Sequence, residues 1–221
     1  AEALALATRL GYAEADPTAD IQGLDAGRKM AILASIAFNS RVTFEDVITE
    51  GITHISAKDI RYARELGCVI KLMGLARNTD TGIEVRVQPM LVPQDHPLAT
   101  VNDSYNAVFV KGDAVGDAMF YGSGAGEMPT ASAIVGDVFD IVRNILFQCT
   151  GRISCTCYKN IPVKEAENIE SRFFMRLHVD DRPGVLAGIA SVLGNNNVSI
   201  AQVIQKHKDG DLAEIVVVTS K

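Results

Sequence analysis

The stretch GYAEADPTADIQGLDAGRK, residues 11–29, runs directly into the apolar segment MAILASIAF, residues 30–38. Its Asp-Pro dipeptide favours an extended or turning backbone, and the segment 20–23 favours a second turn. From there the apolar spacing predicts a helix over 25–38. This helix is apolar nearly all round, so we expect it to be buried.

A charged pair lies at the start of this predicted helix. Asp25 and Lys29 are four residues apart, so they share a face that Ile32 and Ile36 continue. One interpretation is an ordinary salt bridge, worth about 0.2–0.5 kcal/mol. The other is a lysine at the mouth of a buried helix, where it can serve in proton transfer. The density of carboxylates in the same stretch favours the second interpretation.

The same segment resembles a known signature. The pattern Ala7-x-x-x-Gly11 through Asp16-Pro17-x-x-Asp20-Ile21-x-Gly23-x-Asp25-x-x-x-Lys29 is similar to that of homoserine dehydrogenases. The resemblance continues to the carboxyl end through the following matched segments: Gly51-Ile52, Asp59-Ile60, 96–99, 122–126 and 129–133. Members of that family interconvert aspartate semialdehyde and homoserine with NAD(H) or NADP(H).

The resemblance implies roles for individual residues. Lys29 is expected to be the general acid and base, and Asp25 to orient it or assist the proton relay. Glu14 is expected to bind the substrate's ammonium group, and Asp20 to contact the substrate or the lysine. Asp16 precedes a proline, so turn chemistry is a sufficient reason for it.

A complete dinucleotide-binding motif is missing, because no strand–GxGxxG–helix pattern occurs near the start. The family resemblance implies that NAD(P)H is bound mainly by an amino-terminal domain absent from this chain. The glycine-rich segment has GxGxG spacing, and Pro129 suits the first position of a helix over 129–147. A tight turn that needs glycine is one interpretation; a loop touching the cofactor is the one that the resemblance favours. The residues of that loop are Gly122, Gly124, Ala125 and Gly126.

The periodicities predict an α+β fold, a mixed sheet covered by helices. The predicted helices are 1–10, 25–38, 58–66 and 129–147. One hairpin is predicted from the strands 70–76 and 83–92, and a second from 107–111 and 118–121. We assign residues 1–150 to one domain, which in the family supplies the substrate site and the dimer contact.

A linker is predicted over 151–171, and the pattern beyond it changes. Strand, turn, helix, strand and strand follow in the order βαββ over 172–221, and the segment 181–186 resembles that of ACT domains. These modules bind amino acids and are normally βαββαβ, ferredoxin-like, so the module is incomplete. The expected effector is threonine, and its expected binding residues are Asp181, Gly184, Val185 and Leu186.

The missing second helix and last strand would leave a sheet edge open. Such an edge can pair with another chain. We therefore expect side-by-side association or strand exchange through 173–179 and 198–219, giving a homodimer or a higher homo-oligomer.

Composition excludes several classes. A net charge of -6 without a basic cluster argues against nucleic acid as a partner. No long apolar run or signal peptide occurs, so a cytoplasmic protein without membrane association is expected. The 4 cysteines lack CxxC spacing and the 4 histidines are scattered, so we expect reduced thiols and no metal site.

Three functional hypotheses follow. The favoured one is the substrate part of a homoserine dehydrogenase, with weak or absent catalysis by this chain alone. The alternative is an amino-acid-sensing binding module without turnover. The third is a scaffold that retained the dehydrogenase half for dimerisation.

Overall fold

The computed structural model describes residues 8–9, 16–149, 155–206 and 212–220. The chain forms two compact units, residues 1–164 and 165–221, and each is described by itself. Both combine helices with antiparallel strands, which confirms the predicted α+β class. Of the predicted helix 1–10, only positions 8 and 9 are described, and both are helical.

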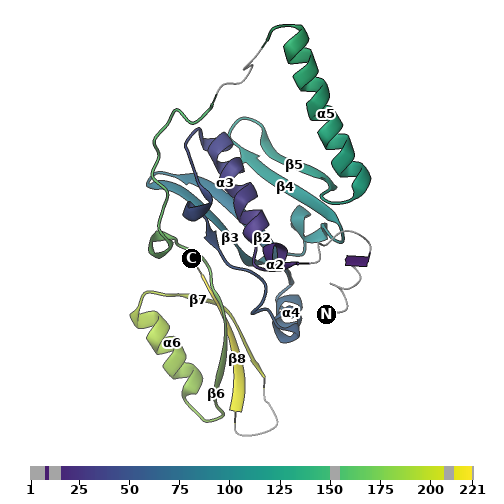
Figure 1. The fold of residues 1–221 in the computed structure, drawn as a ribbon. Helices are drawn as coiled ribbons and strands as arrows, with labels where there is room; N and C mark the ends of the chain where they lie inside the picture. The colour runs from purple at the N-terminus through teal and green to yellow at the C-terminus, as the bar shows by residue number, and fades with distance from the viewer. Residues whose placement is uncertain (1–7, 10–15, 150–154, 207–211, 221) are drawn as a thin grey trace. The chain divides into compact units, whose positions relative to one another are not determined.

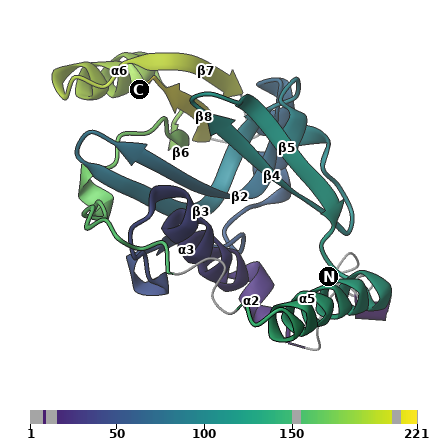
Figure 2. The same cartoon turned by 90° about the horizontal axis from the view of Figure 1, so that it is seen from above.

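The first unit is built on a long hairpin. Strands β2 (Cys68–Thr79) and β3 (Gly82–Pro93) pair antiparallel over their full length, and β1 (Ile48–Thr49) adds parallel to β3. Helix α3 (Leu24–Phe38) lies along one face of this sheet in both views (Figure 1, Figure 2). The predicted hairpin and helix are confirmed. The core between them contains the alternating side chains of β3 together with small residues of the helix: Ile83, Val85, Val87, Ala31 and Ala34.

The face that α3 turns inward differs from the expectation. Its buried residues are Gly27, Ala31 and Ala34. Ile32 and Ile36, which continue the stripe of the charged pair, are each 60% exposed. The helix packs so closely that a Cβ on Gly27 would lie 2.7 Å from the Phe44 ring. A side chain larger than glycine does not fit at position 27 without a shift, while Ile32 and Ile36 face outward, so the expectation of a helix buried nearly all round was wrong.

The first unit also contains two shorter helices and a second hairpin. Where we predicted a second turn, the chain forms the short helix α2 (Thr18–Ile21). The predicted second hairpin is confirmed as β4 (Tyr105–Gly112) and β5 (Gly116–Ser123), a separate two-stranded sheet. Helix α4 (Ala57–Glu65) is confirmed within one residue at each end and carries a capping box. Short 3-10 helices lie at η1 (Phe44–Asp46), η2 (Pro97–Thr100) and, in the second unit, η3 (Ala166–Asn168).

Helix α5 (Glu127–Leu146) begins earlier than predicted. Pro129 occupies its third position rather than its first, because residues 127 and 128 already have helical backbone. A proline is still tolerated there, since the first-turn N–H groups have no partner within the helix. None of the side chains of α5 is buried.

Part of the predicted linker is ordered against the first unit. Lys159 bridges Ser40 and Val163 bridges Ile83, both in parallel orientation. The N–H of Ile161 donates to the Ser40 hydroxyl at 3.0 Å, and Ile161 also packs against the core cluster.

The second unit has the predicted βαββ order. Strand β6 (Phe174–Asp180), helix α6 (Val185–Asn195), strand β7 (Ile200–Lys206) and strand β8 (Leu212–Thr219) follow one another. The sheet order is β6-β8-β7, all antiparallel. Because β8 lies between the other two strands, it cannot be a free edge. The open edge that we expected at 212–219 is therefore wrong; the edges of this sheet are β6 and β7.

Among the described residues, no helix is both long enough and apolar enough to cross a membrane.

Candidate functional site

The turn ahead of α3 is held by close backbone contacts. Gly23 has a φ of 75°, and its carbonyl accepts the N–H of Gly27 at 2.8 Å, which starts the helix. The N–H of Ile52 donates to the carbonyl of Ile21 at 2.9 Å. A Cβ on Gly51 would collide with that same carbonyl oxygen. These contacts fix the signature segment against the end of β1 and so set the position of the α3 amino terminus.

The charged pair forms an ion pair on this fixed helix start. Nζ of Lys29 lies 2.6 Å from a carboxylate oxygen of Asp25. The two side chains are 63% and 47% exposed, so both remain reachable from solvent. The pair has the acid-before-base order that suits i,i+4 spacing. Its exposure means that it contributes little to stability and is free to contact a bound molecule.

The remaining carboxylates of the segment separate into different environments. Asp16 accepts the N–H of Thr18 at 3.0 Å and the Thr18 hydroxyl at 2.5 Å, and these bonds lower the pKa of Asp16. Asp16 therefore stabilises the turn, as we expected. Asp20 lies exposed on α2. Glu14 lies outside the described residues. Among the four residues predicted to act in catalysis or substrate binding, the described part of the chain shows one contact, the ion pair between Asp25 and Lys29.

The glycine-rich segment runs from the end of β5 into α5, and two of its glycines have local steric reasons. A Cβ on Gly124 would collide with the side-chain amide of Asn106. Gly126 has a φ of 118°, and its carbonyl accepts both the N–H and the hydroxyl of Thr130. Gly122 has open space around it. Among the described residues, no hydrogen bond or ion pair joins this segment to Lys29.

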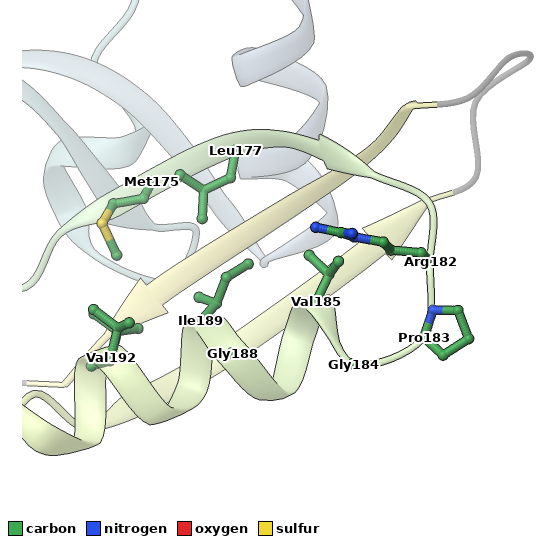
Figure 3. Close-up of a pocket in the computed structure, with 10 residues that line it drawn as sticks. Met175, Leu177, Arg182, Pro183, Gly184, Val185, Gly188, Ile189 and Val192 are labelled. Atoms are coloured by element: carbon green, nitrogen blue, oxygen red, sulfur yellow. The ribbon is translucent and has the colours of Figure 1, made fainter.

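Two pockets lie in the second unit and share the turn before α6. The larger, about 750 Å³, lies between β6 and α6 and is lined mainly by apolar side chains. Figure 3 shows Met175 and Leu177 pointing from the strand toward Val185, Ile189 and Val192 of the helix. The smaller, about 390 Å³, is lined by all of the predicted effector residues: Asp181, Gly184, Val185 and Leu186.

The smaller pocket combines opposite charges. Asp180 and Asp181 bring carboxylates to it, and Arg182 brings a guanidinium whose Nε lies 3.7 Å from Asp180. Helix α6 begins there after Gly184, which makes no side-chain cap, and a helix amino terminus favours an anion. A zwitterion, with one ammonium and one carboxylate group, matches this arrangement.

Sequence reasoning missed several lining residues of this pocket. Arg182 lies inside the segment 181–186 that resembles ACT domains, and its charge was the available signal. Gln205 and Ile215 come from β7 and β8. No local sequence pattern identifies these two residues, because only the pairing of the strands brings them to the turn before α6. No group of three metal-ligand side chains occurs within the residues that the structure describes.

Known proteins match this chain over nearly its whole length. A family model for homoserine dehydrogenase matches residues 1–139, and a model for the ACT domain matches residues 174–221. The chain is 47% identical over 224 residues to the homoserine dehydrogenase of Corynebacterium glutamicum, covering 99% of this chain and 50% of that protein. It is 44% identical over 220 residues to that of Bacillus subtilis, covering 99% and 51%.

A solved structure gives the same result. The crystal structure of a homoserine dehydrogenase from Thiobacillus denitrificans superimposes with a TM-score of 0.89 at 43% identity, covering 98% of this chain and 50% of that one. The chain therefore spans about half the length of the relatives that it matches. With its first unit matched to the dehydrogenase model and its second to the ACT model, this chain belongs to the homoserine dehydrogenase family.

Proposed function

We propose that this chain is the substrate-binding and regulatory part of a longer enzyme that interconverts L-aspartate 4-semialdehyde and L-homoserine with NAD(P)H. The observation that carries the proposal is the solvent-accessible Asp25–Lys29 ion pair at 2.6 Å. It occupies the signature segment, on a helix start that close glycine contacts hold in place.

The proposed chemistry is proton transfer by Lys29. Reduction of the aldehyde creates an alkoxide at C4, which needs a proton from a positioned donor. The ammonium of Lys29 donates that proton and, in the reverse direction, Lys29 accepts it. Asp25 keeps the side chain oriented through the ion pair. Positioned acids and bases of this kind contribute roughly a hundred- to ten-thousand-fold to the rate.

The other assignments follow from the resemblance. Glu14 binds the substrate's ammonium group, and Asp20 contacts the substrate or the lysine. The nicotinamide supplies the hydride. The loop at Gly122, Gly124, Ala125 and Gly126 would contact the cofactor from the substrate side, while the rest of the longer protein holds most of it.

The direct test measures oxidation of NADPH and of NADH with aspartate semialdehyde, for this chain and for the full gene-encoded protein. The proposal expects turnover in the longer protein and little or none in this chain. Absence of turnover in both proteins would overturn it.

A second proposed function is amino-acid sensing by the second unit. The paired charges of the smaller pocket support this function, and threonine is the candidate effector. Titration calorimetry of the full protein with threonine tests it, with lysine and valine as controls. We further propose a cytoplasmic homodimer or higher homo-oligomer, assembled partly along the β6 and β7 edges, which light scattering would test.

A further inference from the structure

Beneath the Asp25–Lys29 pair, the inward side of α3 rests on an aromatic ring. On a helix, position 27 lies almost opposite positions 25 and 29, so Gly27 turns into the fold while the charged pair turns to solvent. A Cβ on Gly27 would lie 2.7 Å from Cε2 of Phe44 and 3.0 Å from the Thr49 hydroxyl oxygen. Both distances are shorter than ordinary van der Waals contact, so the helix start has no room to move further inward.

The position of the Phe44 ring is fixed by its own backbone and by the helix above it. Phe44 is the first residue of η1, whose capping box closes when the Thr43 N–H donates to the Asp46 carboxylate at 2.7 Å. The N–H of Val47, a buried core residue, donates to the Phe44 carbonyl at 3.0 Å. The guanidinium carbon of Arg28 lies 5.7 Å from the centroid of the ring, within the range of a cation–π contact. The ring is therefore a fixed support for the first turns of α3.

A second close contact lies on the other side of Lys29 along the helix. Met30 packs onto β2, where a Cβ on Gly74 would collide with Cγ and Sδ of the methionine side chain. The helix thus meets the rest of the unit closely both just before and just after Lys29. These two contacts set the distance between α3 and the sheet, and with it the place of the Lys29 ammonium group.

We propose that Phe44 is a positioning residue for Lys29, which acts by setting how closely the start of α3 approaches the fold. The inference rests on the proposed function, because it requires Lys29 to be the proton donor and acceptor. A displacement of about 1 Å at a reacting group can lower a rate roughly a hundredfold. A displaced helix start should therefore lower kcat, while substrate binding changes much less.

Two single substitutions test the support in the full gene-encoded protein, assayed with aspartate semialdehyde and NAD(P)H. The methyl group of Gly27→Ala meets the Phe44 ring, so kcat should fall about ten- to a hundredfold and KM should change much less. Phe44→Leu removes Cε2 and loosens the support, so kcat should fall about threefold or more. A parental kcat in either variant would overturn the proposal.

A matched control isolates the contact with the ring. Gly136→Ala places the same methyl group on helix α5, where no atom lies within 4 Å of the position that a Cβ would take. Its kcat and KM should equal those of the parent. Thermal unfolding of every variant shows that the protein assayed is folded.

Two double variants distinguish positioning from a general loss of structure. Gly27→Ala combined with Phe44→Leu should have a kcat within about twofold of Phe44→Leu alone, because the nearest ring atom is gone. In a Lys29→Ala background, Gly27→Ala should lower kcat by less than about twofold, because the lysine that it displaces is absent. An equal loss from Gly27→Ala with and without Lys29 would show a purely structural effect and refute the role of Phe44.

The same measurements separate this inference from the proposed function. No turnover by the parent protein, or an unchanged kcat in Lys29→Ala, would overturn the proposed chemistry and the inference that rests on it. A large loss of kcat in Lys29→Ala together with a parental kcat in Gly27→Ala would overturn the role of Phe44 alone.

Discussion

Nζ of Lys29 lies 2.6 Å from the Asp25 carboxylate, one helical turn earlier on the outward face of α3. A lysine that faces solvent contributes little to the stability of the fold, since exposed ion pairs contribute at most about 1 kcal/mol. In the proposed mechanism the same lysine contacts the substrate. Function and stability should therefore separate cleanly at this position.

Replacing Lys29 by alanine in the full protein should lower kcat by roughly a hundredfold or more and change KM much less. The melting temperature should stay within a few degrees of the parent. Lys111→Ala, an exposed lysine on β4, is the control and should leave both quantities unchanged. An unaltered kcat in the Lys29 variant would remove this residue from the mechanism.

Gly23→Ala should destabilise the protein by about 1–2 kcal/mol or more, since alanine is strained at a φ of 75°. Its Cβ would also lie 3.2 Å from Val87. Gly67→Ala is the matched control, because Gly67 has a φ of 70° and no atom within 4 Å of the position that a Cβ would take. Urea unfolding should show the larger loss for Gly23; equal losses would mean that the Val87 contact is unimportant.

Glu84 should be far more costly to remove than an exposed acid. It is 1% exposed on β3 and pairs with Arg77 and, at 3.2 Å, with Arg86. Glu84→Ala removes the buried carboxylate that balances the Arg86 charge, at a cost of about 3–5 kcal/mol. Asp25→Ala, which breaks an exposed pair, should cost about 0.2–1 kcal/mol. Similar unfolding free energies for the two variants would contradict this account.

The amino-acid sensing proposed for the smaller pocket predicts a charge effect at Asp181. Asp181→Asn keeps the shape of the side chain and removes its charge, so threonine binding should weaken by roughly ten- to a hundredfold. Asp117→Asn, at the β4–β5 turn of the first unit, should leave binding unchanged. Calorimetry measures both, and unchanged affinity in the Asp181 variant would place the effector elsewhere.

The pKa directions of the thiols predict an order of alkylation. A thiol with a lowered pKa loses its proton at lower pH. Cys155 should therefore react with iodoacetamide at lower pH than Cys68. Burial, with a smaller contribution from Asp95, raises the pKa of Cys68 and delays its reaction to higher pH. Peptide mass spectrometry across a pH series reads each cysteine separately. The reverse order would refute both directions.

Local periodicity accounts for what could be predicted of the fold. Alternation in Ile83, Val85 and Val87 identified β3 because a strand's side chains alternate faces whatever its partners are. The βαββ order of the second unit followed from similar short-range patterns. Both hairpins were predicted because turn residues lie between paired strands that are close in sequence.

The candidate site was predicted in part. The i,i+4 spacing of Asp25 and Lys29 implies their contact, since helix geometry alone brings them together. Gln205 was not predicted, because it reaches the smaller pocket from another strand. The roles of Glu14, Asp20 and the glycine-rich loop rest on the family signature rather than on any contact that sequence spacing implies.

By itself the sequence determined the kind and order of the longer helices and strands, the family and the Asp25–Lys29 pairing. Backbone geometry over a few residues dictates each of these, or a motif records it. Only the tertiary structure decided that α3 packs with Gly27, Ala31 and Ala34 inward and that β8 is the central strand. Those outcomes depend on how closely two elements approach and on which strands pair. Ile32 is more hydrophobic than Ala31, yet Ile32 is 60% exposed and Ala31 is buried, because the packing of α3 on the sheet decides which of its faces turns inward.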